Sequence, residues 1–197
     1  MARAETPSRE RIVAGAADMI SRRGLNGTSI RDLAKHARAP LGSTYHYFPE
    51  GKQQLATEAV RYADTMVTRI LRKELDAGPV AGLHAFLALW REIVVASDFR
   101  AGCPVLAVSV EEPPAEDAAP PALLAAAEAF DHWEQLLTDA LRAHGAAPDR
   151  ASGLATLVVA SVEGAIAMCR AKRDTEPLDR VAQQLEALIV GALDRSA

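Results

Sequence analysis

The chain has 197 residues, of which 49% are hydrophobic and only 5% aromatic, and its formal net charge is -4 at pH 7. This length accommodates one small domain and one larger body, and a composition dominated by alanine and leucine favours helix over sheet. The two cysteines, Cys103 and Cys169, show no CxxC or metal-ligand spacing, which argues against a disulfide framework and predicts reduced thiols, no metal and no cofactor.

Charge is unevenly distributed along the chain. Residues 1–52 contain 9 Lys and Arg against 5 Asp and Glu, whereas residues 53–197 contain 13 against 21. A basic head on an acidic body predicts contact with a polyanion through the head alone. The polar N-terminus lacks the apolar stretch of a signal peptide, and no apolar run approaches the ~18 residues of a membrane span. We therefore expect a cytoplasmic protein without membrane contact.

The first predicted helix begins near residues 6–8 and ends at Gly24. Thr6 or Ser8 can cap its free N–H groups, and the glycine provides C-cap chemistry. Its apolar residues recur at helical spacing: Ile12, Ala16, Met19 and Ile20.

Two short helices are predicted next. The first begins after Ser29, because Ser29 and Asp32 have the three-residue separation of a capping box. A turn at residues 39–42 separates it from a helix over residues 43–48, in which Phe48 is expected to plug the core. Two short helices joined by a tight turn, behind a longer support helix, are typical of the helix-turn-helix.

The rest of the chain is also predicted to be helical. A long helix over residues 52–76 connects head and body and can carry a mechanical signal between them. Asp149 is expected to cap one of the later helices, and residues 111–121 to form a loop. These later helices are predicted over residues 80–97, 101–110, 122–144, 149–173 and 175–195.

The predicted fold is therefore all-α, with about nine helices in two domains. Residues 1–52 are expected to form a three-helix DNA-binding domain. Residues 53–197 are expected to form a helical body; the family resemblance and the apolar helix surfaces described below imply that this body binds a ligand and dimerises.

Two stretches of the head, residues 28–34 (TSIRDLA) and 42–52 (GSTYHYFPEGK), resemble the DNA-binding signature of the TetR family. Residues 102–104 (GCP), 162–165 (VEGA) and 173–179 (RDTEPLD) resemble the LmrA/YxaF-like branch of that family. The resemblance implies an all-helical homodimer that binds a palindromic operator and releases it when a small molecule enters the body.

Specific DNA binding needs side chains at base edges and contacts to phosphates that fix the register. Leu41, Ser43 and Tyr45 are expected to face the major groove, and a helix N-terminus with free N–H groups favours a phosphate. In the family, the lysine that matches Lys52 contacts phosphate. Arg31 and Arg38 are plausible further backbone contacts. The complete predicted set is Thr28, Ser29, Leu41, Ser43, Tyr45, His46, Tyr47 and Lys52.

This sequence departs from the common family pattern at two places. Pro40 and Leu41 stand where many relatives have small polar, then polar or basic, residues. Gly51 lengthens the loop before Lys52 by one residue. The first departure affects which base edge the start of the third helix reads. The second affects how far Lys52 reaches.

The last two helices are the predicted dimer interface. The helix over residues 149–173 is apolar nearly all round and must be covered on every side. Pairing these two helices with a second copy gives a four-helix bundle. The residues expected at this interface are Leu154, Val158, Val162, Leu178, Val181, Leu185, Leu188 and Ile189.

Large apolar side chains with few polar groups predict a pocket for an apolar or aromatic ligand. Glu163 is an acid within an apolar helix and can hold a ligand's donor or cation, or cap an internal hydrogen bond. His84 and His132 could act similarly, or lie at the surface. The predicted pocket residues are Phe86, Trp90, Cys103, Leu106, Phe130, Trp133, Glu163 and Met168; taken singly, each is more often a core residue than a ligand contact.

Other function classes find less support. The sequence has no phosphate-binding loop, no GxSxG and no HExxH motif, so catalysis is not expected. A helical interaction protein that does not bind DNA would not need the basic head. A ligand-responsive repressor is therefore the expected function, with a transcriptional activator of the same fold as the alternative.

Overall fold

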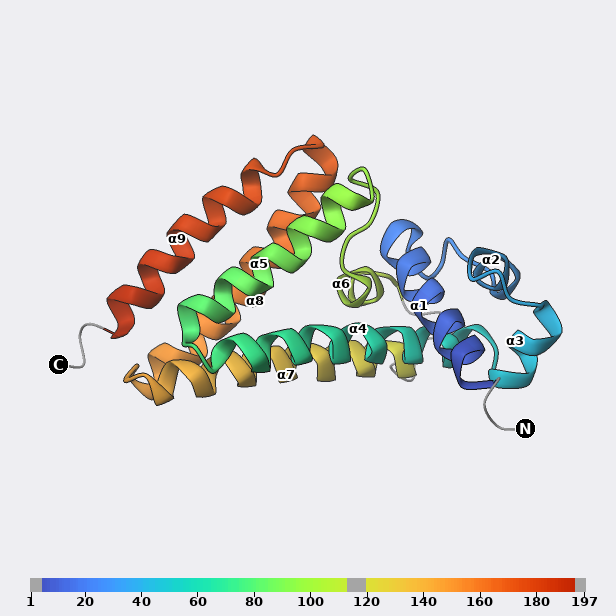
Figure 1. The fold of residues 1–197 in the computed structure, drawn as a ribbon, viewed down its shortest axis with the longest axis horizontal. Helices are drawn as coiled ribbons and strands as arrows, with labels where there is room; N and C mark the ends of the chain where they lie inside the picture. Colours follow the sequence, from blue (N-terminus) through green and yellow to red (C-terminus); the bar gives the residue numbers. More distant parts are fainter. Residues whose placement is uncertain (1–4, 113–119, 194–197) are drawn as a thin grey trace. The chain divides into compact units, whose positions relative to one another are not determined.

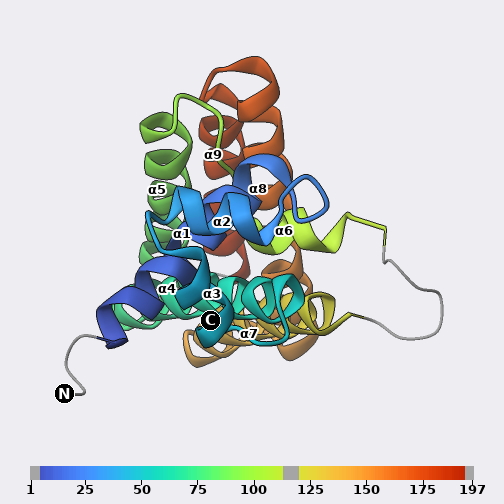
Figure 2. The same ribbon diagram turned by 90° about the vertical axis from the view of Figure 1, so that its right-hand side faces the viewer.

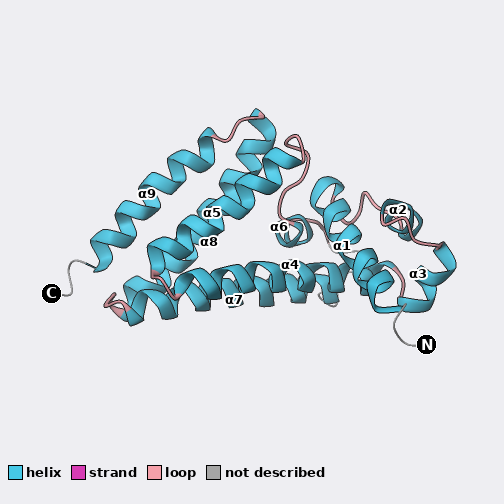
Figure 3. Ribbon diagram, viewed as in Figure 1, coloured by secondary structure: helices cyan, strands magenta, loops and turns pink. Residues whose placement is uncertain are grey.

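The computed structural model describes residues 5–112 and 120–193, and side chains from residue 9 onward. Within these ranges all regular structure is helical (Figure 3), which confirms the all-α prediction. The described helices are α1 (Glu5–Arg23), α2 (Ile30–His36), α3 (Leu41–Tyr47), α4 (Lys52–Leu75), α5 (Pro79–Ala96), α6 (Pro104–Ser109), α7 (Pro121–Ala143), α8 (Pro148–Lys172) and α9 (Glu176–Leu193).

Local sequence signals explain where several helices begin. The Ser29 hydroxyl accepts a hydrogen bond from the N–H of Asp32 at 3.1 Å, and the Asp32 carboxylate accepts one from the N–H of Ser29 at 3.3 Å. This confirms the capping box at the start of α2. Prolines occupy the first turn of α5, α6 and α8, where their missing N–H leaves no intrahelical bond unmade.

Several helix starts differ from the prediction by one to three residues, most at α6, which begins at Pro104 rather than at residue 101. At α3 and α8 a proline also changes the predicted cap or turn. α3 begins at Leu41 with Pro40 as its N-cap, so residues 41–42 belong to the helix rather than to the turn. α8 begins at Pro148 after the N-cap Ala147, so Asp149 is not the cap. Asp149 lies in the first turn, where a carboxylate still interacts favourably with the helix dipole.

By its internal contacts the chain divides into two compact units. Figure 1 labels the helices and colours them along the sequence. The first unit contains residues 5–64 with 103–112 and 120–129, and the second contains residues 65–102 and 130–193. The division passes through α4 and α7 and groups α6 with the N-terminal helices. These units are defined by which residues pack together. The predicted boundary at residue 52 instead separates the expected DNA-binding head from the expected ligand-binding body.

In the first unit, α1 packs against α2, α3 and α6, and α2 packs against α3 (Figure 2). Phe48 is fully buried beneath these helices, and the Arg9 guanidinium lies 5.4 Å from the centre of its ring. Burial of such a ring contributes about 1.5–3 kcal/mol to stability, so Phe48 is part of the core, as predicted. Other side chains with 0% exposure are Ile12, Ile20, Leu33 and Leu55.

In the second unit, α5, α8 and α9 pack against one another. α5 and α8 each contain an apolar segment long enough to cross a membrane, by length and composition alone. The expectation that no apolar run approaches this length was therefore wrong. Within the protein, however, 39% of the α5 segment and 50% of the α8 segment are buried. Core positions such as Val158 and Val162, both 0% exposed, account for much of the apolar character of α8.

Candidate nucleic-acid interface

The turn between α2 and α3 is closed by backbone hydrogen bonds. The N–H of Ala39 donates to the carbonyl of Ala34 at 2.9 Å, and the N–H of Arg38 donates to the carbonyl of Lys35 at 3.1 Å. This pair of bonds is the Schellman arrangement that ends many helices. Arg38 occupies its left-handed position, with φ of 52°, which usually belongs to glycine.

One face of α3 is anchored and the other is open. Thr44 is fully buried, and its hydroxyl donates to the carbonyl of Pro40 at 3.2 Å. Gly42, Tyr45 and His46 lie on the exposed face, where half of the Tyr45 side chain is accessible. A Cβ added to Gly42 would meet nothing within 4 Å. α3 therefore presents a fixed, uncovered face of the size that enters a major groove.

The other predicted residues of α3 lie at the margins of this face. Leu41, Ser43 and Tyr47 are half-buried, and the Tyr47 ring contacts those of His46 and Phe48, with centroids 5.6 and 6.4 Å away. The exposed face thus centres on Gly42 and His46. Successive residues of a helix are rotated by 100°, so the burial of Thr44 determines which α3 residues are exposed and which lie at the margins.

The predicted phosphate contacts have partners within the protein. The Thr28 hydroxyl donates to the carbonyl of Leu25 at 2.9 Å, and the threonine is only 5% exposed. The Lys52 ammonium donates to the carbonyls of Leu25 and Thr28 at 2.9 and 3.0 Å. Thr28 and Lys52 thus brace the α1–α2 turn, whatever else they contact.

Ser29 is exposed at the start of α2, next to the exposed Arg31. Its hydroxyl also donates to the Asp32 carboxylate at 2.5 Å. This hydrogen bond lowers the pKa of Asp32 below its ordinary value. The carboxylate of the capping box is therefore charged at neutral pH.

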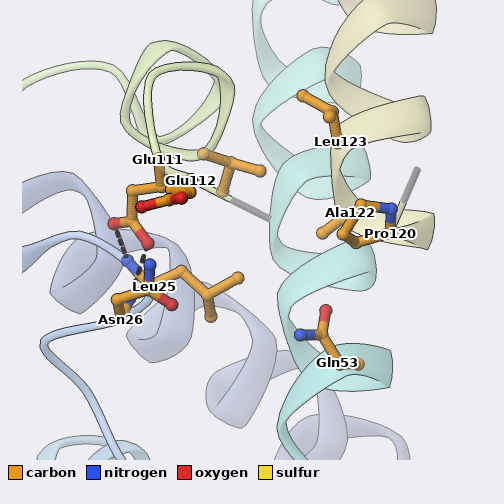
Figure 4. A pocket seen from close by; sticks show the side chains of 9 residues that line it. Leu25, Asn26, Gln53, Glu111, Glu112, Pro120, Ala122 and Leu123 are labelled. Atoms are coloured by element: carbon orange, nitrogen blue, oxygen red, sulfur yellow. Dashed lines mark hydrogen bonds between the residues drawn. The ribbon is translucent and has the colours of Figure 1, made fainter. Parts of the chain in front are cut away.

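Glu111, which follows α6, is a residue that sequence reasoning missed. Its carboxylate accepts hydrogen bonds from the N–H groups of Leu25 and Asn26 at 2.5 and 2.6 Å (Figure 4). The sequence offered no signal, since Glu111 lies 85 to 86 residues from its partners in a stretch that reads as a loop.

Four aromatic residues of the predicted pocket come together in the second unit. The ring centroids of Phe86 and Trp133 lie 5.9 Å apart, those of Phe86 and Trp90 6.3 Å, and those of Phe130 and Trp133 5.6 Å. All three pairs have the edge-to-face geometry that aromatic rings prefer. The Trp90 Nε1 is buried and has no hydrogen-bond partner among the described residues.

The other four predicted pocket residues are less uniform. Glu163, in α8, is only 4% exposed. Cys103 and Leu106 belong to the first unit, whereas the aromatic cluster belongs to the second. Met168 is 48% exposed on the surface of α8. We therefore correct the predicted set by removing Met168, because a side chain this accessible in the single chain does not line an enclosed pocket.

Most of the residues predicted at a dimer interface are already buried within one chain. The periodicity of α8 and α9 identified their apolar faces, but packing between these two helices and α5 covers those faces. Val181 is half-buried and Leu188 is 41% exposed. The buried six are Leu154, Val158, Val162, Leu178, Leu185 and Ile189, each at most 7% exposed. These six are corrected to core positions of the single chain.

The exposed face of α8 is nevertheless apolar. It carries small residues and two large apolar side chains, Leu157 (42% exposed) and Met168. A Cβ added to Gly153 or Gly164 would meet nothing within 4 Å. Small residues on an open helix face allow a second helix to approach closely.

Two sequence motifs of the body meet in the second unit. The Arg173 guanidinium donates to a carboxylate oxygen of Asp98 at 2.7 Å, and this lowers the pKa of Asp98. Arg170 donates to the carbonyl of Arg100 at 3.0 Å. A Cβ added to Gly102 would lie 3.1 Å from the Arg170 side chain, which would have to shift slightly to admit it. The motifs hold the end of α8 against the segment after α5.

Comparison with known proteins agrees with this architecture. The family model of the bacterial regulatory proteins, tetR family, matches residues 12–59, and that of the transcriptional regulator LmrA/YxaF-like C-terminal domain matches residues 79–184. The chain is 42% identical over 187 residues to an HTH-type transcriptional regulator of Mycobacterium tuberculosis, covering 94% of this chain and 95% of that one.

It is also 30% identical over 185 residues to the HTH-type transcriptional regulator LmrA of Bacillus subtilis, covering 92% of this chain and 96% of that one. Among solved structures, the regulatory protein TetR from Rhodobacter sphaeroides is similar with a TM-score of 0.80 at 23% identity, covering 93% of this chain and 99% of that one. The likeness to this last protein is one of fold.

Proposed function

The chain belongs to the TetR family of bacterial transcriptional regulators, not to a family of enzymes, and from this premise we propose that it is a repressor released from DNA by a small molecule. It binds a palindromic operator as a homodimer. The observation that carries the proposal is the open face of α3, held on a buried core by Thr44 and Phe48. The basic residues 1–52 of the chain supply the attraction to phosphate.

Base recognition centres on Tyr45 and His46, with Leu41 and Ser43 at the margins of the groove-facing surface. Phosphates are contacted by Ser29 and Tyr47. They are also contacted by Thr28 and Lys52, which brace the turn between α1 and α2. Phosphate contacts fix the register of α3, and only the α3 side chains distinguish one base from another.

The experiment is selection of a duplex from random DNA by the wild-type protein, followed by affinity measurements on that duplex. Tyr45→Ala should lower affinity roughly 10- to 100-fold and leave the oligomeric state intact, because a lost base contact costs about 1–3 kcal/mol. Tyr62→Ala is the matched control, since Tyr62 is 38% exposed on α4, outside the recognition face. Equal affinities of the two variants would contradict the assignment of α3.

Two copies assemble through the exposed faces of α8 and α9. The face of α8 from Gly153 to Met168 carries no exposed charge, and Val181 and Leu188 lie on one flank of α9. Joining such faces removes apolar area from water and sets two recognition helices about 34–36 Å apart, one turn of DNA. The palindromic operator follows from this two-fold symmetry.

The effector is an apolar or aromatic molecule with a hydrogen-bond acceptor. The aromatic cluster supplies an apolar lining, and the Trp90 indole N–H is a buried donor without an acceptor among the described residues. Such a donor costs about 1–3 kcal/mol, which a ligand oxygen would recover. Both tryptophans of the chain, Trp90 and Trp133, lie in this cluster, so a bound effector should change the intrinsic fluorescence.

Repression is favoured over activation because a dimer bound across a promoter blocks polymerase without further contacts. Activation requires an additional surface that recruits polymerase. A reporter fused to the promoter beside the selected operator separates the two. Deletion of the regulator's gene should raise reporter expression, and a fall would identify an activator.

A further inference from the structure

The turn between α1 and α2 is held by charged side chains from two other elements of the first unit. The Lys52 ammonium, at the start of α4, binds carbonyl oxygens of the turn. The Glu111 carboxylate, just beyond α6, accepts hydrogen bonds from two backbone N–H groups of the same turn, those of Leu25 and Asn26 (Figure 4). We call Glu111 and these two amides the α6 clasp.

The chemistry of the clasp suits its position. Gly24 ends α1 with φ of 74°, and the next two N–H groups both reach the carboxylate. A carboxylate that accepts backbone N–H groups forms charge-assisted bonds, roughly twice as strong as neutral ones. A Cβ added at Gly24 would collide with the Glu111 carboxylate. Glycine is therefore needed here for its conformation and for the clasp.

The clasp lies where it can control the DNA-reading helices. The turn leads directly into Ser29, the N-cap of α2, and α2 packs against α3. α6 also packs against α1. We propose that Glu111 is a positioning residue for operator binding: it fixes the α1–α2 turn, so that α6 completes the DNA-binding head. This inference rests on the proposed function of the α3 face.

The cavity beside the clasp is too small to give it another role. Its walls include Gln53, Val108 and Leu123, and it holds about 20 Å³ of space for water. One water molecule needs about 10–15 Å³ on this measure, so the space that the described residues enclose does not admit a small-molecule effector. Glu111 therefore acts through the turn that it holds.

The direction of the effect separates the clasp from simple electrostatics. Removing an acid from a DNA-binding protein reduces repulsion and strengthens binding, whereas loss of the clasp weakens it. We expect Glu111→Ala to lower affinity for the selected duplex about 10-fold, equivalent to about 1.4 kcal/mol. Glu111→Gln, which keeps one acceptor oxygen, should recover part of the loss. Glu112→Ala, at an exposed neighbour, should bind at least as tightly as the wild type.

A second readout reports on the clasp without DNA. In ¹H–¹⁵N spectra the Leu25 and Asn26 amides should shift and exchange faster with solvent in Glu111→Ala, and less so in Glu111→Gln. The dependence of log Kd on log salt should keep its slope, because no phosphate contact is removed. Wild-type affinity in Glu111→Ala, or unchanged amides, would overturn the inference. Failure of the wild type to select any duplex would instead refute the proposed function, and the amide measurement would still test the clasp.

Discussion

The Lys52 ammonium lies 2.9 Å from the carbonyl oxygen of Leu25 and 3.0 Å from that of Thr28. An ammonium carries three hydrogens, so two are used inside the protein and one remains for DNA. Lys52 thus joins the start of α4 to the α1–α2 turn. The family resemblance implied a phosphate contact for this lysine, and the structure adds a brace within the head.

Lys52→Met tests this brace, since methionine keeps much of the apolar stem and removes the ammonium. The free energy of unfolding should fall by about 1–2 kcal/mol, because two turn carbonyls lose a charged donor. Urea denaturation measures the change, with Lys35→Met, an exposed lysine on α2, as the control. If Lys52 also binds phosphate, the salt slope of operator binding falls by about 1. Equal stability of the two variants would refute the brace.

Arg38 should show a conflict between stability and DNA binding. Its left-handed backbone, with φ of 52°, is disfavoured for residues with a Cβ. Both Arg38→Gly and Arg38→Ala lose the guanidinium, but only glycine relieves the backbone. The glycine variant should therefore be about 1 kcal/mol more stable than the alanine variant in thermal unfolding. Both should bind the selected duplex more weakly than wild type, and equal stability would show that the backbone carries no strain.

Gly164→Arg should separate dimerisation from folding. Gly164 lies on the exposed face of α8, where a Cβ meets nothing within 4 Å. Arginine has the higher helix propensity, so the single chain should not lose stability. The charge and bulk should nevertheless raise the dimer dissociation constant roughly 100-fold or more. Ultracentrifugation measures this, with Gln183→Arg on the exposed surface of α9 as control; a dimer that persists at low concentration would exclude this face.

Leu185 is unsuitable for the same test. Leu185 is only 3% exposed within one chain, so Leu185→Asp would bury an unpaired charge and unfold the protein before it reports on a dimer.

The two cysteines should be unreactive in the folded protein. Burial raises the pKa of the Cys169 thiol above its ordinary value of 9.0, and Cys103 is 3% exposed. Because the thiolate is the nucleophile and the shift is upward, Cys169 stays protonated at pH 8. Neither should react with a thiol-specific disulfide reagent until urea unfolds the chain. Ser152→Cys, at an exposed position of α8, provides the positive control, and rapid labelling of either native cysteine would contradict this expectation.

The sequence predicted the helices and the head well because those signals are local. The Ser29–Asp32 capping box and Gly24 act within a few residues of themselves, and each did what its chemistry predicts. The errors at α3, α6 and α8 arose where a proline shifts the start of the helix by one to three residues.

By itself, then, the sequence determined an all-helical chain with a helix-turn-helix head, since periodicity, capping and the residue 28–52 motif need only neighbouring residues. Tertiary structure alone decided which apolar face of α8 and α9 stays uncovered, because periodicity identifies a buried face but not what buries it. It also decided the roles of Lys52 and Glu111. Their partners are backbone groups 24 to 86 residues away, and no side-chain pattern records them.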